Sequence, residues 1–164
     1  MDEESFDYVI VGAGTAGCVI AGRLSEYGKF RICVLEAGPS DTNPFIHIPA
    51  GVLHTLRNPL INWMYEGVPS PGLQGRAIDH ARGRTLGGSG AINGHIYNRG
   101  QKTDFDTWAQ LGNKGWSYEE VLPYFIKSEN KIGGGDPGYH GSGGPFTITE
   151  IEEKDPLCDA FIDT

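Results

Sequence analysis

Few cysteines, no long apolar run and a shortage of basic residues each exclude a class of protein for this sequence of 164 residues. Its odd set of three cysteines, Cys18, Cys33 and Cys158, predicts free buried thiols and neither disulfides nor a metal site. No apolar run is long enough to span a bilayer, and no secretion signal precedes Tyr8. The net charge of -8 argues against binding to nucleic acid or to anionic membranes. Together these absences favour a soluble protein in the reducing cytoplasm.

The clearest motif is a glycine turn between a strand and a helix. Residues 8–11, YVIV, predict a buried parallel strand, and residues 16–26 have apolar side chains at helical spacing before a stop at Gly28. Gly12 permits the tight turn, Gly14 lets the main chain approach a diphosphate, and Gly17 lets the helix pack against the strand. The free N–H groups and the helix dipole at this end bind an anion without a basic side chain.

A second apolar strand, predicted over residues 32–35, ends in an acid, Glu36. An acid about 20 residues beyond the glycines binds the ribose hydroxyls of an adenine dinucleotide and disfavours a 2′-phosphate. Strand, turn, helix and acid therefore predict a dinucleotide site. An NAD-dependent dehydrogenase is one interpretation of this part of the chain.

A second glycine cluster lies at residues 82–100, RGRTLGGSGAINGHIYNRG. Gly87, Gly88 and Gly90 surround the hydroxyl of Ser89, and the side-chain amide of Asn93 follows with Gly94. Such a segment can line a flat, polar ring system. The alternative is a mobile glycine loop with an Asn-Gly turn at the surface.

These motifs resemble the glucose-methanol-choline (GMC) flavoprotein oxidoreductases. The resemblance rests on VGAGTAG (11–17), LEAG (35–38) and GRTLGGSGAIN (83–93), with Tyr97, Gly100 and Asp106 downstream. It continues through DFDTW (104–108), GWSYEEVLPYFIKSE (115–129) and HGSGGP (140–145), and so covers essentially the whole chain. The sequence is most similar in appearance to bacterial alcohol, sorbose and polyethylene-glycol dehydrogenases, and choline dehydrogenases are also similar.

The resemblance implies an α/β fold in which a Rossmann-like parallel sheet binds FAD. It assigns the adenosine and diphosphate half to Gly12, Gly14, Thr15, Ala16, Gly17, Glu36 and Ala37. It assigns the flavin half to Thr85, Leu86, Gly88, Ser89, Asn93, Gly94, His95 and Ile96, with the N–H groups of residues 94–96 tuning the ring. Trp63 matches a position near the cofactor, where core packing is the alternative interpretation. Some members attach the flavin to a histidine where this chain has Ile92, so we expect noncovalent FAD.

The resemblance also implies an incomplete enzyme. Family members are several times longer, and separated stretches of one chain build their FAD domain. Two adjacent parallel strands do not form a stable sheet alone. We therefore expect residues 1–132 to be the amino-terminal part of the FAD domain, including the flavin-lining loop. The turn-rich segment at 39–81 is either a lid-like cover for the cofactor or an ordinary long connection. Residues 133–164 would cross into a substrate domain through a glycine-rich hinge or turn at 133–144 and end in a helix that is cut short. The remaining polypeptide of the same enzyme would complete both domains.

Catalysis is expected to depend on residues outside this chain. In the family, a histidine near the carboxyl terminus takes the proton of an alcohol substrate while hydride passes to the flavin. No residue here matches that motif, and we assign structural or solvated roles to all five histidines: His47, His54, His80, His95 and His140. Lyases and photodecarboxylases share the FAD motifs, so they stay an alternative to an alcohol oxidoreductase.

Between the motifs and the carboxyl end, three further elements are predicted. These are a short helix over residues 106–111, a helix capped by Ser117 with Glu120 at the capping-box position, and a strand over 146–149.

Overall fold

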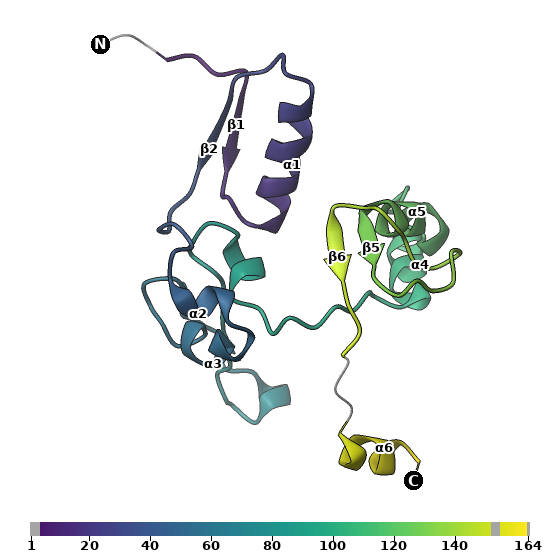
Figure 1. The fold of residues 1–164 in the computed structure, drawn as a ribbon. Helices are drawn as coiled ribbons and strands as arrows, with labels where there is room; N and C mark the ends of the chain where they lie inside the picture. The colour runs from purple at the N-terminus through teal and green to yellow at the C-terminus, as the bar shows by residue number, and fades with distance from the viewer. Residues whose placement is uncertain (1–3, 152–154, 164) are drawn as a thin grey trace. The chain divides into compact units, whose positions relative to one another are not determined.

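A parallel pair of strands joined by one helix opens the computed structural model, which describes residues 4–151 and 155–163 (Figure 1). Strand β1 (Tyr8–Val11) pairs with β2 (Ile32–Leu35), and helix α1 (Thr15–Glu26) connects them. Gly28, just after the helix, has a φ of +61°, in the left-handed region where helices commonly stop. The predicted order of strand, glycine turn, helix and strand is confirmed.

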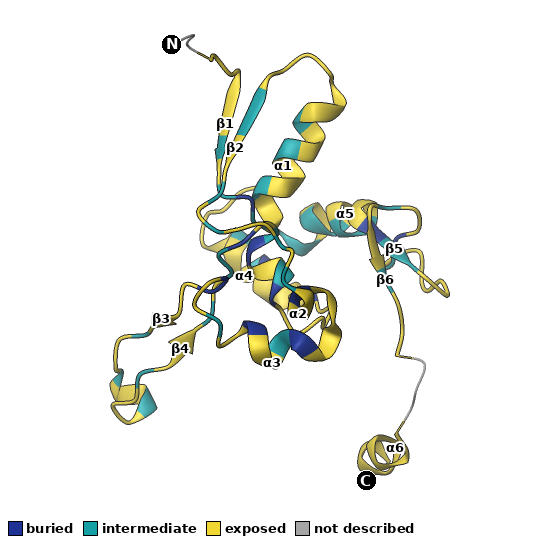
Figure 2. Cartoon of the chain, turned by 60° about the vertical axis from the view of Figure 1, so that its left-hand side comes forward, coloured by how far each residue is buried: buried dark blue, intermediate teal, exposed yellow. Residues whose placement is uncertain are grey.

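Residues of this sheet are exposed or half-buried and none is fully buried, which differs from the buried strand that the sequence predicts. Val9 and Val11 are 56% and 84% exposed (Figure 2). The difference has a simple physical cause: two strands and one helix cannot cover both faces of a parallel sheet. The cysteines differ in the same way, because Cys18 and Cys158 are free but exposed and only Cys33 is half-buried.

A small apolar core joins the middle of the chain to the second glycine cluster. Ile46, Ile61 and Ile92 pack together, so the segment after Glu36 and the segment after Gly88 share one core. The intervening chain forms short elements: α2 (Pro44–His47), η1 (Pro49–Gly51), α3 (Val52–Thr55), the antiparallel pair β3 (Tyr65–Glu66) and β4 (Asp79–His80), η2 (Pro71–Leu73) and η3 (Gly88–Ala91).

The chain divides after Ile96 into two units, and the second contains α4 (Lys102–Gln110), α5 (Tyr118–Ser128), β5 (Glu129–Lys131), β6 (Phe146–Ile148) and α6 (Pro156–Ile162). Helix α4 begins earlier than the predicted residue 106, because Asp104 accepts the N–H of Gln101 in a capping box. The predicted capping box of α5 is confirmed: the N–H of Ser117 donates to Oε2 of Glu120 at 3.0 Å. Hydrogen bonds to the Glu120 carboxylate lower its pKa: the bond from the Ser117 hydroxyl has the larger effect, and the bond from the Ser117 N–H adds to it.

A buried carboxylate, Glu129, organises the second unit. It pairs with Arg99, accepts the N–H of Gly141 at 2.9 Å and lies 3.0 Å from Nδ1 of His140. Burial raises the pKa of Glu129, but the Gly141 N–H, His140 and Arg99 outweigh it, so the pKa is lowered overall. The glycine-rich loop at 133–144 thus closes over Glu129 inside this unit. The predicted domain boundary after residue 132 stays a prediction.

No helix among residues 4–151 and 155–163 has the length and apolar character needed to cross a membrane.

Candidate functional site

The first glycine cluster forms a turn that leads from β1 into the amino end of α1. Gly12 has a φ of +94° and donates its N–H to the Leu35 carbonyl at 2.7 Å. A Cβ on Gly17 would lie 2.0 Å from the Gly12 carbonyl oxygen, so only glycine permits this close contact between helix and strand. The helical bonds of α1 start with Cys18, whose N–H donates to the Gly14 carbonyl at 2.9 Å. The N–H groups of residues 15–17 precede this bond and form the amino end of the helix dipole.

Glu36 ties the glycine turn to the end of β2. Its Oε2 accepts the N–H of Ala13 at 2.8 Å, and its Oε1 accepts the N–H of Gly38 at 2.9 Å. A carboxylate has about four acceptor positions, so each oxygen retains one for a ligand hydroxyl. The side chain therefore holds the loop and stays able to bind a sugar.

The second glycine cluster lies directly against the first. Gly87 donates its N–H to the Ala13 carbonyl at 2.8 Å and forms a parallel bridge with Gly14. Thr85 is completely buried, and its hydroxyl donates to the Pro39 carbonyl at 2.9 Å. The fold therefore brings together two clusters that are some 70 residues apart in the sequence.

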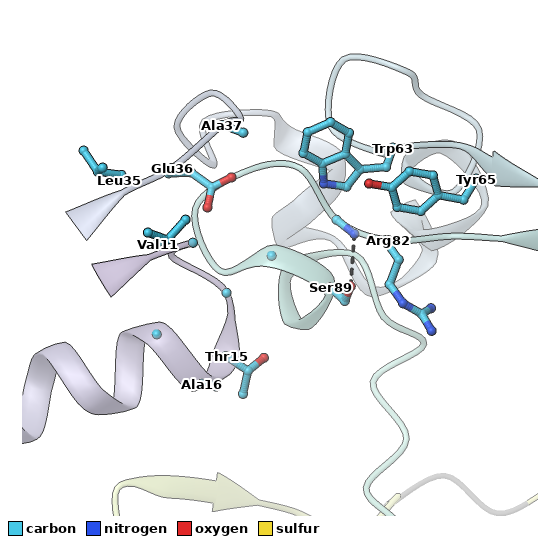
Figure 3. A pocket seen from close by; sticks show the side chains of 15 residues that line it. Val11, Thr15, Ala16, Leu35, Glu36, Ala37, Trp63, Tyr65, Arg82 and Ser89 are labelled. Carbon is cyan, nitrogen blue, oxygen red and sulfur yellow. Dashed lines mark hydrogen bonds between the residues drawn. The ribbon is translucent and has the colours of Figure 1, made fainter. Parts of the chain in front are cut away.

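Both clusters line one pocket of about 560 Å³, within the usual range for small-molecule sites (Figure 3). The predicted cofactor residues that line it are Gly12, Gly14, Thr15, Ala16, Gly17, Glu36, Ala37, Trp63, Gly88 and Ser89. Ser89 Oγ also accepts the N–H of Gly83 at 3.0 Å, which fixes the hydroxyl at the edge of the pocket. The structure thus gathers the predicted adenosine half, Trp63 and the start of the predicted flavin half.

The other predicted residues lie outside this pocket. Thr85 is buried, Leu86 is exposed, and neither lines the pocket. Asn93, Gly94, His95 and Ile96 follow η3 as an exposed segment. Their contacts with a cofactor stay predictions.

An aromatic pair forms a second wall of the pocket. The rings of Trp63 and Tyr65 are stacked, with centroids 5.8 Å apart and an interplanar angle of 4° (Figure 3). The guanidinium of Arg84 lies 5.4 Å from the centre of the Trp63 ring. Sequence reasoning missed Tyr65, because Met64 between the two rings has a φ of +53°, a left-handed conformation that the residue spacing does not reveal.

Arg82 and Gly83 line the pocket too, and Val11 and Leu35 contribute the ends of the two strands. Arg82 is the cationic residue of the lining, opposite in charge to the anion that the helix end favours. Arg82 directly precedes the GRTLGG motif in the sequence, and this position could have identified it as a candidate lining residue.

The lining fits an adenine dinucleotide in its chemistry. The glycine turn leaves N–H groups accessible to a diphosphate, the Glu36 carboxylate can accept ribose hydroxyls, and the Trp63 and Tyr65 rings offer flat apolar faces. The pocket thus combines one carboxylate with N–H donors at a helix end, which are the groups that such a ligand needs.

Comparison with known proteins identifies the class. The model of the GMC oxidoreductase family matches residues 6–164, and the chain therefore belongs to this family. GMC oxidoreductases bind FAD, which settles the earlier alternative of NAD in favour of FAD.

Individual relatives agree with this assignment. The chain is 44% identical over 157 residues to an oxygen-dependent choline dehydrogenase of Rhizobium rhizogenes and 40% identical to an alcohol dehydrogenase [acceptor] of Pseudomonas putida. Each alignment covers 96% of this chain and 28% of the relative. The chain thus spans less than a third of the length of these curated relatives.

Solved structures are similar over nearly the whole chain. Pyridoxine 4-oxidase from Mesorbium loti has a TM-score of 0.87 at 40% identity, covering 97% of this chain and 31% of that one. A formate oxidase from Aspergillus oryzae RIB40, studied for FAD modification, has a TM-score of 0.79 at 33% identity, covering 99% and 30%. The predicted fold, the amino-terminal part of a GMC FAD-binding domain, is confirmed.

Proposed function

We propose that the chain is the FAD-binding amino-terminal segment of an enzyme that oxidises an alcohol by hydride transfer to the flavin. The observation that carries this proposal is the pocket where the two glycine clusters meet, lined by Gly14, Glu36 and Ser89. FAD, when bound, supplies the hydride acceptor. The residues of this chain supply binding and orientation.

Each wall of the pocket has a distinct part in binding. The N–H groups at the start of α1 hold the diphosphate, and Arg82 adds a positive charge at the same pocket. Glu36 accepts hydrogen bonds from the adenosine ribose and keeps the glycine turn in place through Ala13. The hydroxyl of Ser89 marks the side of the pocket that leads to the flavin half.

The attachment of FAD is noncovalent in this proposal. Residue 92, where some family members carry the linking histidine, is an isoleucine that is 3% exposed and packs against Ile46 and Ile61. A hydrocarbon side chain has no nucleophile for a bond to the flavin. Ile92 stabilises the core beneath the site instead.

The catalytic base comes from the rest of the enzyme. His140 is held by Glu129 in a structural network, His47 lies 3.9 Å from the Asp41 carboxylate, and neither histidine lines the pocket. The partners are therefore the remaining polypeptide, which carries the base, and a small alcohol substrate. We place the boundary between the FAD domain and the substrate domain after residue 132, and the enzyme in the reducing cytoplasm, as its free thiols suggest.

Absorbance spectroscopy of the enzyme, purified with its remaining polypeptide, tests this function. We expect flavin bands in the native protein and release of FAD into solution on denaturation. Under anaerobic conditions, one member of a panel of alcohols that includes choline and pyridoxine should bleach these bands. A colourless protein that does not take up FAD would contradict the cofactor. A yellow protein that no alcohol bleaches would favour the lyase or photodecarboxylase alternative.

A further inference from the structure

A turn at Asn93 shapes the segment that was predicted to line the flavin. The side-chain oxygen Oδ1 of Asn93 accepts the N–H of His95 at 2.9 Å, which is an Asx turn. His95 itself has a φ of +57°, in the left-handed region that residues other than glycine seldom adopt. The side chain of Asn93 therefore stabilises an unusual backbone conformation two residues further on.

Little else in the first unit holds this conformation. Ile96 is 88% exposed, and a Cβ added to Gly94 would have no neighbour within 4 Å. In the described part of the chain, the N–H groups of Gly94 and Ile96 have no hydrogen-bond partner, whereas the N–H of His95 is used by Asn93. Two of the three N–H groups expected to tune the flavin are thus available, and the third is not.

We infer that Asn93 is a positioning residue, whose amide oxygen fixes the backbone of residues 94–96 so that the N–H groups of Gly94 and Ile96 donate to acceptor atoms of the flavin ring. This inference depends on the proposed FAD site. It assigns the function of the Asn93 side chain to its acceptor oxygen acting on His95, and none to its amide nitrogen acting on the cofactor.

Two matched pairs of variants separate these possibilities. Asn93→Asp keeps an acceptor oxygen but loses the amide donor, while Asn93→Ala loses both. His95→Asn keeps a residue that tolerates the left-handed region, while His95→Val places a β-branched residue there, which is strongly disfavoured. Within each pair, only the second variant disturbs the turn.

The experiment measures the FAD dissociation constant and the flavin reduction potential of each variant in the enzyme purified with its remaining polypeptide. We expect Asn93→Ala and His95→Val to bind FAD about five- to tenfold more weakly, the effect of one net hydrogen bond. Their flavin reduction potential should be more negative, because fewer N–H groups would stabilise the reduced ring. Asn93→Asp and His95→Asn should keep affinities within about twofold of the native enzyme.

Asn113→Ala, at an exposed asparagine in the second unit, is the control and should leave both quantities unchanged. Equal losses in Asn93→Asp and Asn93→Ala would show that the amide nitrogen binds the cofactor directly and would overturn the inference. Native affinity and potential in His95→Val would overturn it as well. A native enzyme without FAD would instead refute the proposed function, so the two failures are distinguishable.

Discussion

Replacing Gly14 with alanine is a selective test of how closely the diphosphate approaches the main chain. A Cβ at this position would lie 3.9 Å from its nearest neighbour, the Cα of Gly88, and the backbone φ of -76° suits any residue. Because Gly14 lines the pocket, we expect the added methyl group to narrow the space for the diphosphate. The variant therefore obstructs the ligand while leaving the fold intact.

The expected magnitudes separate binding from stability. Alanine is a poor residue at the N-cap of α1 and costs about 1 kcal/mol there, but the stiffer unfolded chain returns about 0.4–1 kcal/mol. The unfolding free energy of the FAD-free enzyme should thus change by less than about 1 kcal/mol. Loss of one N–H bond to a charged phosphate costs about 1.5–3 kcal/mol, which weakens FAD binding roughly 10- to 150-fold.

Fluorescence titration of the FAD-free enzyme with FAD, together with urea unfolding, measures both quantities. Gly22→Ala is the matched control, because it lies in the same helix where an added Cβ meets open space. We expect that variant to bind FAD normally. Gly17→Ala should lose binding and stability together, since its Cβ would collide with the Gly12 carbonyl. Native FAD affinity in Gly14→Ala would refute the placement of the diphosphate at this turn.

Three further predictions concern Glu36, Thr85 and Glu129. Glu36→Ala should weaken FAD binding by about 1.5–3 kcal/mol in a calorimetric titration, through loss of a charge-assisted bond, and unchanged affinity would mean that the carboxylate only holds Ala13 and Gly38. Thr85→Val should lower FAD occupancy because the hydrogen bond to the Pro39 carbonyl is lost, while Thr85→Ser keeps that bond. Equal occupancy in both variants would show that this hydrogen bond does not support the FAD site. Because the pKa of Glu129 is lowered by folding, its contribution to stability is complete above its ordinary value of 4.5 and is lost as the pH falls below it. Thermal unfolding from pH 3 to 7, a range of about four units around that value, should show this loss in the native enzyme and a flatter profile in Glu129→Gln.

Local patterns predicted the backbone around the first glycine cluster well. The apolar runs before Gly12 and before Glu36 and the helical spacing between them each report a short stretch of backbone, and the structure confirms both strands and the helix. The capping box at Ser117 could also be predicted from the sequence, because its two partners, Ser117 and Glu120, lie within one helical turn.

Contacts between distant segments could not be predicted in the same way. Thr85 is a candidate for flavin contact by motif position, yet its hydroxyl is buried against the Pro39 carbonyl, 46 residues away. The pairing of His140 with Glu129 is invisible in a spacing of 11 residues, because the glycine-rich loop folds back to create it. Exposure of β1 was mispredicted for a related reason: burial depends on strands and helices that this chain does not contain.

A crystal structure of the enzyme purified with its own nucleotide would test the central claim most directly. We expect FAD with its diphosphate within hydrogen-bond distance of the N–H groups of residues 15–17 and its adenosine ribose on Glu36. We also expect the flavin ring beside Ser89 and the 93–96 segment. A nucleotide bound elsewhere, or a flavin ring remote from Asn93, would contradict the claim.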